Sequence, residues 1–241
     1  MCTVSFISIK GKTIITSNRD ENIQREKAAA PSVELLNNKR IFFPKDSKAG
    51  GTWFAASDKA VIAVLLNGAF VKHTASPPYR KSRGLVLLEI IEADDPFLFF
   101  KKMDLQDIEP FTVMLYQPAN LYELRWDGNK KHELKLNILQ NYIWSSATLY
   151  TDEVIQHRKN LFNRFINDAE IINPGSIYQF HAKNNRDDEN GFIINRQTGM
   201  KTFSITQAVL QHNSISFLHN DLLTDQKFEA TMHINPVPVN L

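Results

Sequence analysis

The order of strand-like and helix-like segments constrains the fold of this chain more than any other feature. Two segments rich in Thr, Val, Ile and Phe, 3–9 and 13–19, flank a Lys10-Gly11-Lys12 turn and predict a β-hairpin that starts directly after Cys2. Blocks of strands and blocks of helices follow, with no Pro/Gly/Ser-rich linker between them. Such segregated blocks are typical of the α+β class. We therefore predict one domain, 1–241, with two antiparallel sheets packed together and helices outside.

The remaining elements are predicted from periodicity and from turn signals. The segment 61–66 is expected to be a strand buried on both faces, the segment 28–38 is expected to be irregular around Pro31, and 192–196 and 200–206 are expected to form a hairpin. The other predicted strands are 41–43, 52–57, 111–116, 121–126, 132–137, 142–147, 215–218 and 228–234, and the predicted helices are 83–93, 96–103, 151–169 and 175–182.

Charge and composition narrow the classes of partner. The chain has 28 Lys+Arg and 26 Asp+Glu, a formal net charge of +2, so nothing favours nucleic acid or an anionic membrane as the main partner. A local basic stretch runs from Lys72 to Arg83; a solvated loop is the favoured interpretation, and a pocket for an acidic ligand is the alternative. We expect a small-molecule substrate or ligand, and the sequence leaves homo-oligomerisation open.

Location is inferred from what the N-terminal region and the apolar runs lack. The stretch after Cys2 has no basic region before it and no small-residue cleavage site after it, unlike a signal peptide. The longest strongly apolar run, 60–66, is far shorter than the roughly 18 residues of a membrane helix, so no membrane insertion is expected. A single cysteine permits no intramolecular disulfide. The expected location is the cytoplasm.

Cys2 is the residue with the most informative chemistry. Removal of Met1 would place a thiol and a free α-amino group on adjacent carbons of one residue. Their reference pKa values are about 8.5 and about 8, so the neutral amine can accept the thiol proton near neutral pH. The alternative is an incidental cysteine in a strand, which is common.

Hairpin pairing would bring the charged end of the second strand close to Cys2. Because the two strands are of similar length, Asn18, Arg19 and Asp20 are expected near the start of the first. A carboxylate there can hold the α-ammonium, and a guanidinium can lower the thiol pKa or bind an anionic group of a substrate. A charged turn with no catalytic role is an equally good interpretation of the spacing alone.

Five ordered motifs make the chain resemble a known family. They are Met1-Cys2-Thr3, Asn18-Arg19-Asp20-Glu21 with Arg25, Gly50-Gly51-Thr52-Trp53, Asn67-Gly68 and Ser82-Arg83-Gly84. Together they resemble the NRDE-motif family, also called the transport and Golgi organization protein 2 family, over essentially the whole chain. This family is similar in fold to the N-terminal nucleophile (Ntn) hydrolases, which are four-layer αββα sandwiches. Its mechanistic relatives, penicillin V acylase and bile salt hydrolase, cleave non-peptide amides with an N-terminal cysteine.

The resemblance implies roles for individual residues. Cys2 would be the nucleophile, Asp20 would lie beside it, and Asn67 would donate a hydrogen bond to the oxyanion. The relatives have an Arg three positions before the Asp; Ser17 stands there in this chain, and Arg19 is the candidate for that role. A second Asn of the relatives falls near Trp144-Ser145-Ser146, so Ser145 is a candidate substrate contact, and Arg186 and Arg196 are candidates for a late catalytic Arg.

Two further interpretations stay open at this stage. Asn18 and Trp53 could contact a substrate, although Trp53 suits the core at least as well. The histidines show no metal-ligand spacing, and no nucleotide-binding glycine motif is present, so neither a metal nor a cofactor is expected. The favoured function is a cysteine amidohydrolase of the Ntn type. The alternative, which the resemblance implies, is a non-catalytic binding or trafficking protein related to haem or lipid.

Overall fold

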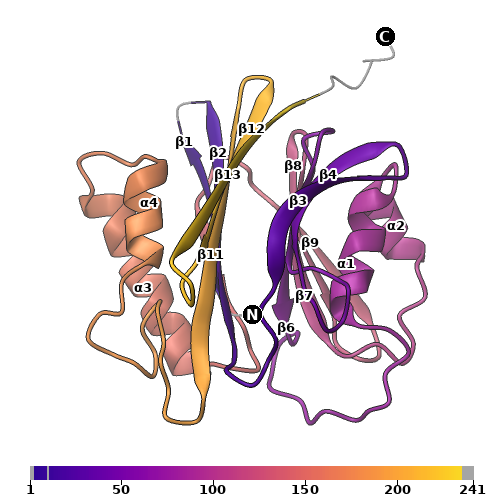
Figure 1. Ribbon diagram of the computed structural model, residues 1–241, viewed down its shortest axis with the longest axis horizontal. Coiled ribbons are helices and arrows are strands. Elements are labelled where there is room, and N and C mark those ends of the chain that lie inside the picture. Colours follow the sequence, from indigo (N-terminus) through magenta and orange to yellow (C-terminus); the bar gives the residue numbers. More distant parts are fainter. Residues whose placement is uncertain (1–2, 10, 235–241) are drawn as a thin grey trace.

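A computed structural model describes residues 3–9 and 11–234. Two antiparallel sheets pack face to face, and each carries a pair of helices on its outer face (Figure 1). The expected α+β class and the four-layer αββα sandwich are confirmed. Lys10, at the predicted first turn, lies outside the described residues.

The first sheet has six strands in the order β10-β1-β2-β11-β12-β13, so the N-terminal hairpin lies near its centre. The hairpin pairs β1 with β2 in antiparallel register, with Thr3 opposite Asn18. Helices α3 and α4 cover the outer face of this sheet through a cluster that includes Ile7, Phe162 and Phe180. The elements are β1 Thr3–Ile9, β2 Lys12–Asn22, β10 Tyr142–Ser145, β11 Met200–Gln211, β12 Ser214–Asp221, β13 Gln226–His233, α3 Asp152–Asp168 and α4 Pro174–His181.

The second sheet has seven strands in sequence order, β3 to β9, each joined to the next along the chain. Strand β6 is almost wholly buried, as its continuous apolar sequence predicts, because α1 covers one face and the other sheet covers the opposite face. The elements are β3 Ala29–Leu36, β4 Lys39–Lys45, β5 Phe54–Ser57, β6 Ile62–Asn67, β7 Phe111–Gln117, β8 Asn120–Trp126, β9 Lys131–Leu136, α1 Arg83–Glu92 and α2 Pro96–Lys102.

Two predicted segments differ from the structure. The segment 28–38 is not irregular, because Pro31 sits on β3 at the edge of the sheet, where a bulge between Ala29 and Ser32 accommodates it. The predicted hairpin of 192–196 with 200–206 forms only next to its turn. Asn195 bridges Lys201, the N–H of Arg196 donates to the carbonyl of Met200 (2.8 Å), and the N–H of Thr202 donates to that of Ile194 (3.0 Å). From Ser204 onwards this edge of β11 pairs with β12, and the other edge of β11 pairs with β2.

Two glycines bring the start of α1 against the loop before β5. The backbone N–H of Thr52 donates to the carbonyl of Gly84 (3.2 Å). A Cβ on Gly84 would lie 2.9 Å from the N and O atoms of Thr52, and a Cβ on Gly51 would clash with the backbone of Gly84 and Leu85. The close approach therefore requires glycine at both positions.

We expect Gly51→Ala to destabilise the protein by about 1–3 kcal/mol, because the added methyl group meets backbone atoms that cannot rotate away. Urea unfolding followed by circular dichroism measures this loss. The control is Gly175→Ala in α4, where a Cβ would meet only the side-chain oxygen of Asn173, at 3.2 Å. An equal effect of the two substitutions would contradict the role of the Gly51–Gly84 contact.

Candidate active site

Four of the ordered motifs meet around one cavity of about 470 Å³. Its wall includes Arg19, Glu21 and Arg25 from the β2 region, Gly51 to Trp53 before β5, Asn67 at the end of β6, and Ser82 to Gly84 at the start of α1. These segments are far apart in sequence and come from both sheets. A cavity of this size suits a small ligand.

Strand β2 supplies the cavity with every second side chain. Arg19 and Glu21 line it, whereas Asn18 and Asp20 have their hydrogen-bond partners on the helix-covered face of the sheet. This alternation follows from the pleat of a β-strand. The four-residue motif is therefore divided between the cavity and the layer behind the sheet.

Arg19 joins the two sheets across the cavity wall. Its Nη2 donates to Oδ2 of Asp46 (2.9 Å), and its guanidinium stacks on the ring of Trp53, with 4.2 Å from Cζ to the ring centroid. Arg25 binds the same carboxylate through Nε (3.2 Å) and Nη2 (2.9 Å). Burial lowers the pKa of Arg19, although the charges of Glu21 and Asp46 oppose that shift.

Asp46 is the carboxylate that neutralises these two arginines. Burial by itself would raise the pKa of Asp46, but hydrogen bonds from Arg25 and the backbone N–H of Ala49, with the positive charges of Arg25 and Arg19, lower it overall. Asp46 is therefore ionised at neutral pH. The sequence gives no sign of this role, because Asp46 lies outside the motifs and at the end of an otherwise ordinary strand.

Behind the sheet, Asp20 belongs to a second network. It accepts hydrogen bonds from the hydroxyls of Tyr150 (3.0 Å) and Thr202 (2.5 Å). Arg158 of α3 stacks on the ring of Tyr150 (3.7 Å from Cζ to the centroid) and donates to the hydroxyl of Thr3 (2.5 Å). These contacts fix the start of β1, one peptide bond after Cys2.

Arg158 was not predicted, although the sequence held a signal for it. It lies three residues after Ile155 and four before Phe162, on the apolar stripe of α3, and only 1% of it is exposed. The late-arginine candidates behave differently. Arg196 contacts Tyr150 from farther away, at 5.2 Å, and neither Arg196 nor Arg186 lines the cavity.

Asn18 anchors α4 to the sheet. Its Nδ2 donates to the carbonyls of His181 (3.0 Å) and Phe192 (2.9 Å), and its Oδ1 accepts from Nδ1 of His181. The other ring nitrogen of His181 accepts from the hydroxyl of Ser5 (2.7 Å). Asn18, His181 and Ser5 are all fully buried, so this chain of hydrogen bonds holds structure and does not face the cavity.

The predicted site residues are thus only partly brought together. Arg19, Trp53 and Asn67 line the cavity, and Asp20 and Asn18 lie on the other face of β2. Ser145 pairs with Thr3 at the end of β10 but is not in the cavity wall. Cys2, the predicted nucleophile, lies outside the described residues.

The basic stretch expected at 72–83 is divided in the same way. Lys81 and Arg83 line the cavity, while His73 pairs with Glu109 (3.1 Å). Arg83 also pairs with Glu109 (3.0 Å), and burial lowers the pKa of Arg83 against the attraction of that carboxylate. The stretch thus runs from solvent at Lys72 to the cavity wall at Lys81 and Arg83.

Similarity to known proteins assigns this chain to a family. The family model described as transport and Golgi organisation 2 matches residues 1–225. The chain belongs to that family. A comparison with curated protein sequences found no match.

Solved structures with a similar fold include a hydrolase and an acid amidase. Two variants of conjugated bile acid hydrolase from Clostridium perfringens are each 11% identical with a TM-score of 0.56, one covering 96% of this chain and 92% of that chain, the other 99% of both. The Caenorhabditis elegans ortholog of N-acylethanolamine-hydrolyzing acid amidase is 9% identical with a TM-score of 0.60, covering 86% of this chain and 92% of that chain. At these identities the likeness shows the fold, that of the Ntn hydrolases, and this family member shares it.

Two further observations concern ligands and membranes. Within the described ranges, no three His, Cys, Asp or Glu side chains gather as a metal site would require. None of the helices in those ranges has the length and apolar character needed to span a membrane.

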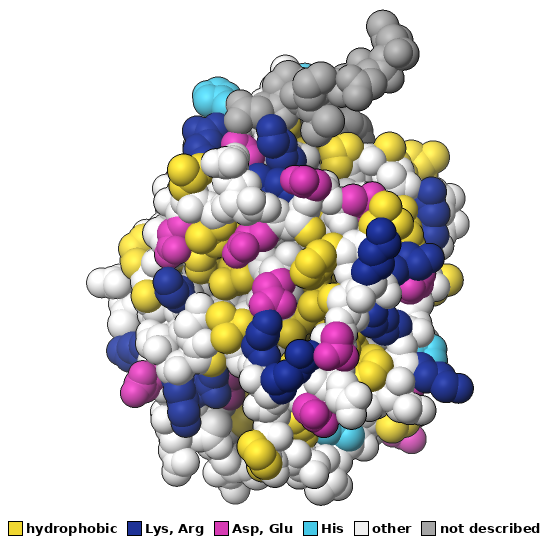
Figure 2. Space-filling model, turned by 90° about the vertical axis from the view of Figure 1, so that its right-hand side faces the viewer, with side chains coloured by type: hydrophobic (Ala, Val, Ile, Leu, Met, Phe, Trp, Pro, Cys, Tyr) yellow, Lys and Arg dark blue, Asp and Glu magenta, His cyan; other side chains and the backbone are white. Residues whose placement is uncertain are grey.

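On the face seen in Figure 2, acidic and basic side chains are mixed and do not form a patch of one sign.

We expect Asp46→Asn to lower the free energy of unfolding by about 3 kcal/mol, because two arginines would lose the charge that compensates them. Urea titration at pH 7 measures this. The matched control is Glu34→Gln, which removes an exposed ion pair with Lys45 (3.5 Å) and should cost less than about 1 kcal/mol. Similar losses in the two variants would contradict the central role of Asp46.

His181 should make stability depend on pH. Burial and the charge of Arg158 lower the pKa of His181 from 6.5 to about 3. The unfolded chain therefore takes up this proton first, so the contribution of His181 is full above pH 6.5 and declines as the pH falls towards 3. The expected slope is about 1.4 kcal/mol per pH unit in that window.

The test compares slopes rather than absolute stabilities. His181→Gln should flatten the dependence of the unfolding free energy on pH between 6.5 and 4, and His157→Gln, on the exposed side of α3, should leave it unchanged. An unchanged slope in His181→Gln would show that other groups cause the acid sensitivity.

Proposed function

We propose that this protein hydrolyses a small, non-peptide amide or a similar acyl bond, with Cys2 as the nucleophile after Met1 is removed. The main support is the convergence of motifs: four separated segments surround one cavity, and β2, which supplies Arg19 to it, pairs with the strand that begins immediately after Cys2. The likeness in fold to bile acid hydrolase and to N-acylethanolamine-hydrolyzing acid amidase adds support.

The proposed reaction uses the free α-amino group of Cys2 as its base. The amine accepts the thiol proton, the sulfur attacks the carbonyl carbon, and a tetrahedral oxyanion forms. The C–N bond then breaks, the leaving amine takes the proton from the α-ammonium, and an acyl-enzyme remains. Water, deprotonated by the same amine, attacks the acyl-enzyme and releases the acid and the thiol.

The surrounding side chains support these steps in different ways. Asn67 lies in the cavity wall at the end of β6, where its amide N–H can donate to the oxyanion. Asp20, fixed by Tyr150 and Thr202, gives a negative charge near the start of β1 that favours the protonated α-amine after the first transfer. Arg19 shares the single carboxylate of Asp46 with Arg25, so the pair of guanidinium groups leaves positive charge at the cavity wall, which favours the thiolate.

We expect Cys2→Ala to abolish hydrolysis and covalent labelling by an acylating probe, and Asn67→Ala to lower kcat about 100-fold. Intact mass establishes whether Met1 is absent, and release of amine from a panel of N-acyl amides measures turnover. Asn120→Ala, which changes a partly exposed amide at the start of β8, away from the cavity wall, is the matched control and should retain full activity.

Equal labelling of wild type and Cys2→Ala would refute the catalytic role of Cys2. Retention of Met1 in the purified protein would refute the use of the α-amine of Cys2 as the base. Binding of the amides without turnover by the processed protein would favour the non-catalytic binding protein on the same scaffold.

A further inference from the structure

Basic side chains outnumber acidic ones in the cavity wall. Its cationic residues are Arg19, Arg25, Lys48, Lys81 and Arg83, and its carboxylates are those of Glu21, Asp46 and Glu109. The whole chain carries a net charge of only +2, so the excess of basic groups is concentrated around this cavity. Such a wall attracts an anion and repels a cation.

Two of the three carboxylates in the wall are closely engaged with cations. Asp46 accepts from Arg19 and Arg25, and Glu109 pairs with both Arg83 and His73. The third, Glu21, lies 4.0 Å from Arg19. Each guanidinium has five N–H donors, which is more than these ion pairs use, and a guanidinium cannot accept a hydrogen bond. The wall therefore has spare donors for a ligand with several acceptor oxygens.

The N-terminus of α1 adds donors to the same wall. Ser82, Arg83 and Gly84 line the cavity, and the first turn of this ten-residue helix contains no acidic residue. The hydroxyl of Ser82 accepts from the N–H of Leu85 and so caps one of the free N–H groups of the first turn. The other N–H groups at the start of the helix point away from the helix body and have no partner within the helix. These groups and the helix dipole favour an anion.

Trp53 supplies an independent observation that indicates a ligand. It lines the cavity, only 2% of it is exposed, and its Nε1–H has no acceptor within the part of the chain that the structure describes. A buried donor without an acceptor is costly. A ligand oxygen would satisfy it after a small shift of the side chains that cover the atom.

The position of Arg83 relates this wall to the proposed reaction centre. Nη1 of Arg83 (3.2 Å) and the N–H of Gly68 (3.0 Å) both donate to the carbonyl of Pro110, so Arg83 is a close neighbour of the Asn67-Gly68 turn. A group held by Arg83 would lie near the bond that Asn67 is proposed to activate.

We propose that the ligand of this cavity carries an anionic oxyacid group, a carboxylate or a phosphate, bound by Lys81, Arg83 and the N-terminus of α1. That this anionic group is part of a substrate rests on the proposed function. In that function the scissile amide lies beside Asn67, a few bonds away from the anionic group. Specificity then comes from the charge on the amine portion of the amide. Arg83 and Lys81 are binding residues and take no part in bond breaking. Lys81 also pairs with Glu89 of α1, so its ammonium group would be shared between that carboxylate and the ligand.

The test uses three probes with one acyl chain: N-hexanoylglycine, N-hexanoylethanolamine and the O-phosphate ester of N-hexanoylethanolamine. Calorimetry with the full-length Cys2→Ala protein gives affinities without turnover, and wild type gives kcat/KM. We expect the two charged probes to bind at least tenfold more tightly than the neutral one at low salt. The stronger of the two identifies the oxyacid as a carboxylate or a phosphate.

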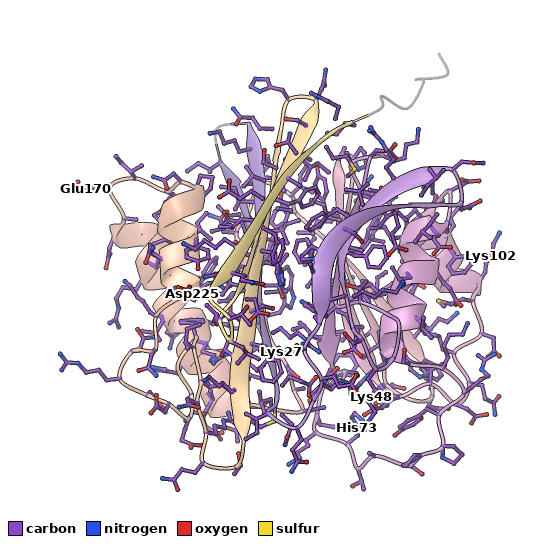
Figure 3. All side chains as sticks on the ribbon, in the orientation of Figure 1. Lys27, Lys48, His73, Lys102, Glu170 and Asp225 are labelled. Carbon is purple, nitrogen blue, oxygen red and sulfur yellow. The ribbon has the colours of Figure 1, made fainter. Side chains whose placement is uncertain are left out.

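Variants of the wall keep the test decisive. Arg83→Met and Lys81→Met should each reduce the preference for charged probes at least threefold. If loss of the Arg83–Glu109 pair prevents Arg83→Met from folding, Lys81→Met still tests the site. The control variant is Lys102→Met, which removes the same charge from α2. Lys102 lies at the outer edge of the molecule in Figure 3, far from Lys48 at the cavity, so this substitution should leave the preference unchanged.

The outcomes separate this inference from the proposed function. Equal binding of the neutral and charged probes, or a preference that survives both Arg83→Met and Lys81→Met, would overturn the anion site even where hydrolysis is observed. Selective binding of the charged probes without turnover by wild type would support the anion site and count against the proposed hydrolysis.

Discussion

The alternation of side chains along β2 is the constraint on which the rest of the structure depends. Asn18 and Asp20 hold the layer formed by α3 and α4, while Arg19 and Glu21 form part of the cavity between the sheets. One strand thus joins the scaffold to the candidate site. Its register with β1 and β11 fixes both sets of contacts together, because a shift of one residue would exchange the two faces.

Electrostatics then decides what the cavity can hold. Asp46 stabilises the buried Arg19 and the partly exposed Arg25, and Glu109 stabilises Arg83. With Asp46 and Glu109 committed to protein cations, most of the spare hydrogen-bonding capacity of the wall consists of guanidinium donors. In the proposed anion site, this capacity would select for charge on the ligand and place that charge close to Asn67.

Much of the fold could be predicted from the sequence, because long strands and helices with clear periodicity carry their own signal. Strand β6 and helices α1 and α3 are examples. Tertiary pairing overrode the local pattern at Pro31, which an edge bulge accommodates. The hairpin of 192–196 with 200–206 forms only next to its turn, because β12 pairs with that edge of β11 from Ser204 onwards. The motifs predicted which segments would meet. They did not predict the partners Asp46, Arg158 and His181, since each acts through a contact far away in sequence.

The Gly51–Gly84 contact has a consequence for how this cavity can change. Because backbone touches backbone there, the first turn of α1 has no cushion of flexible side chains between it and the loop before β5. The backbone of that wall can therefore move only together with the helix, whereas the side chains of Lys81 and Arg83 can still change rotamer. A ligand would meet a backbone frame of fixed position, and its charged group would be met by side chains that adjust to it.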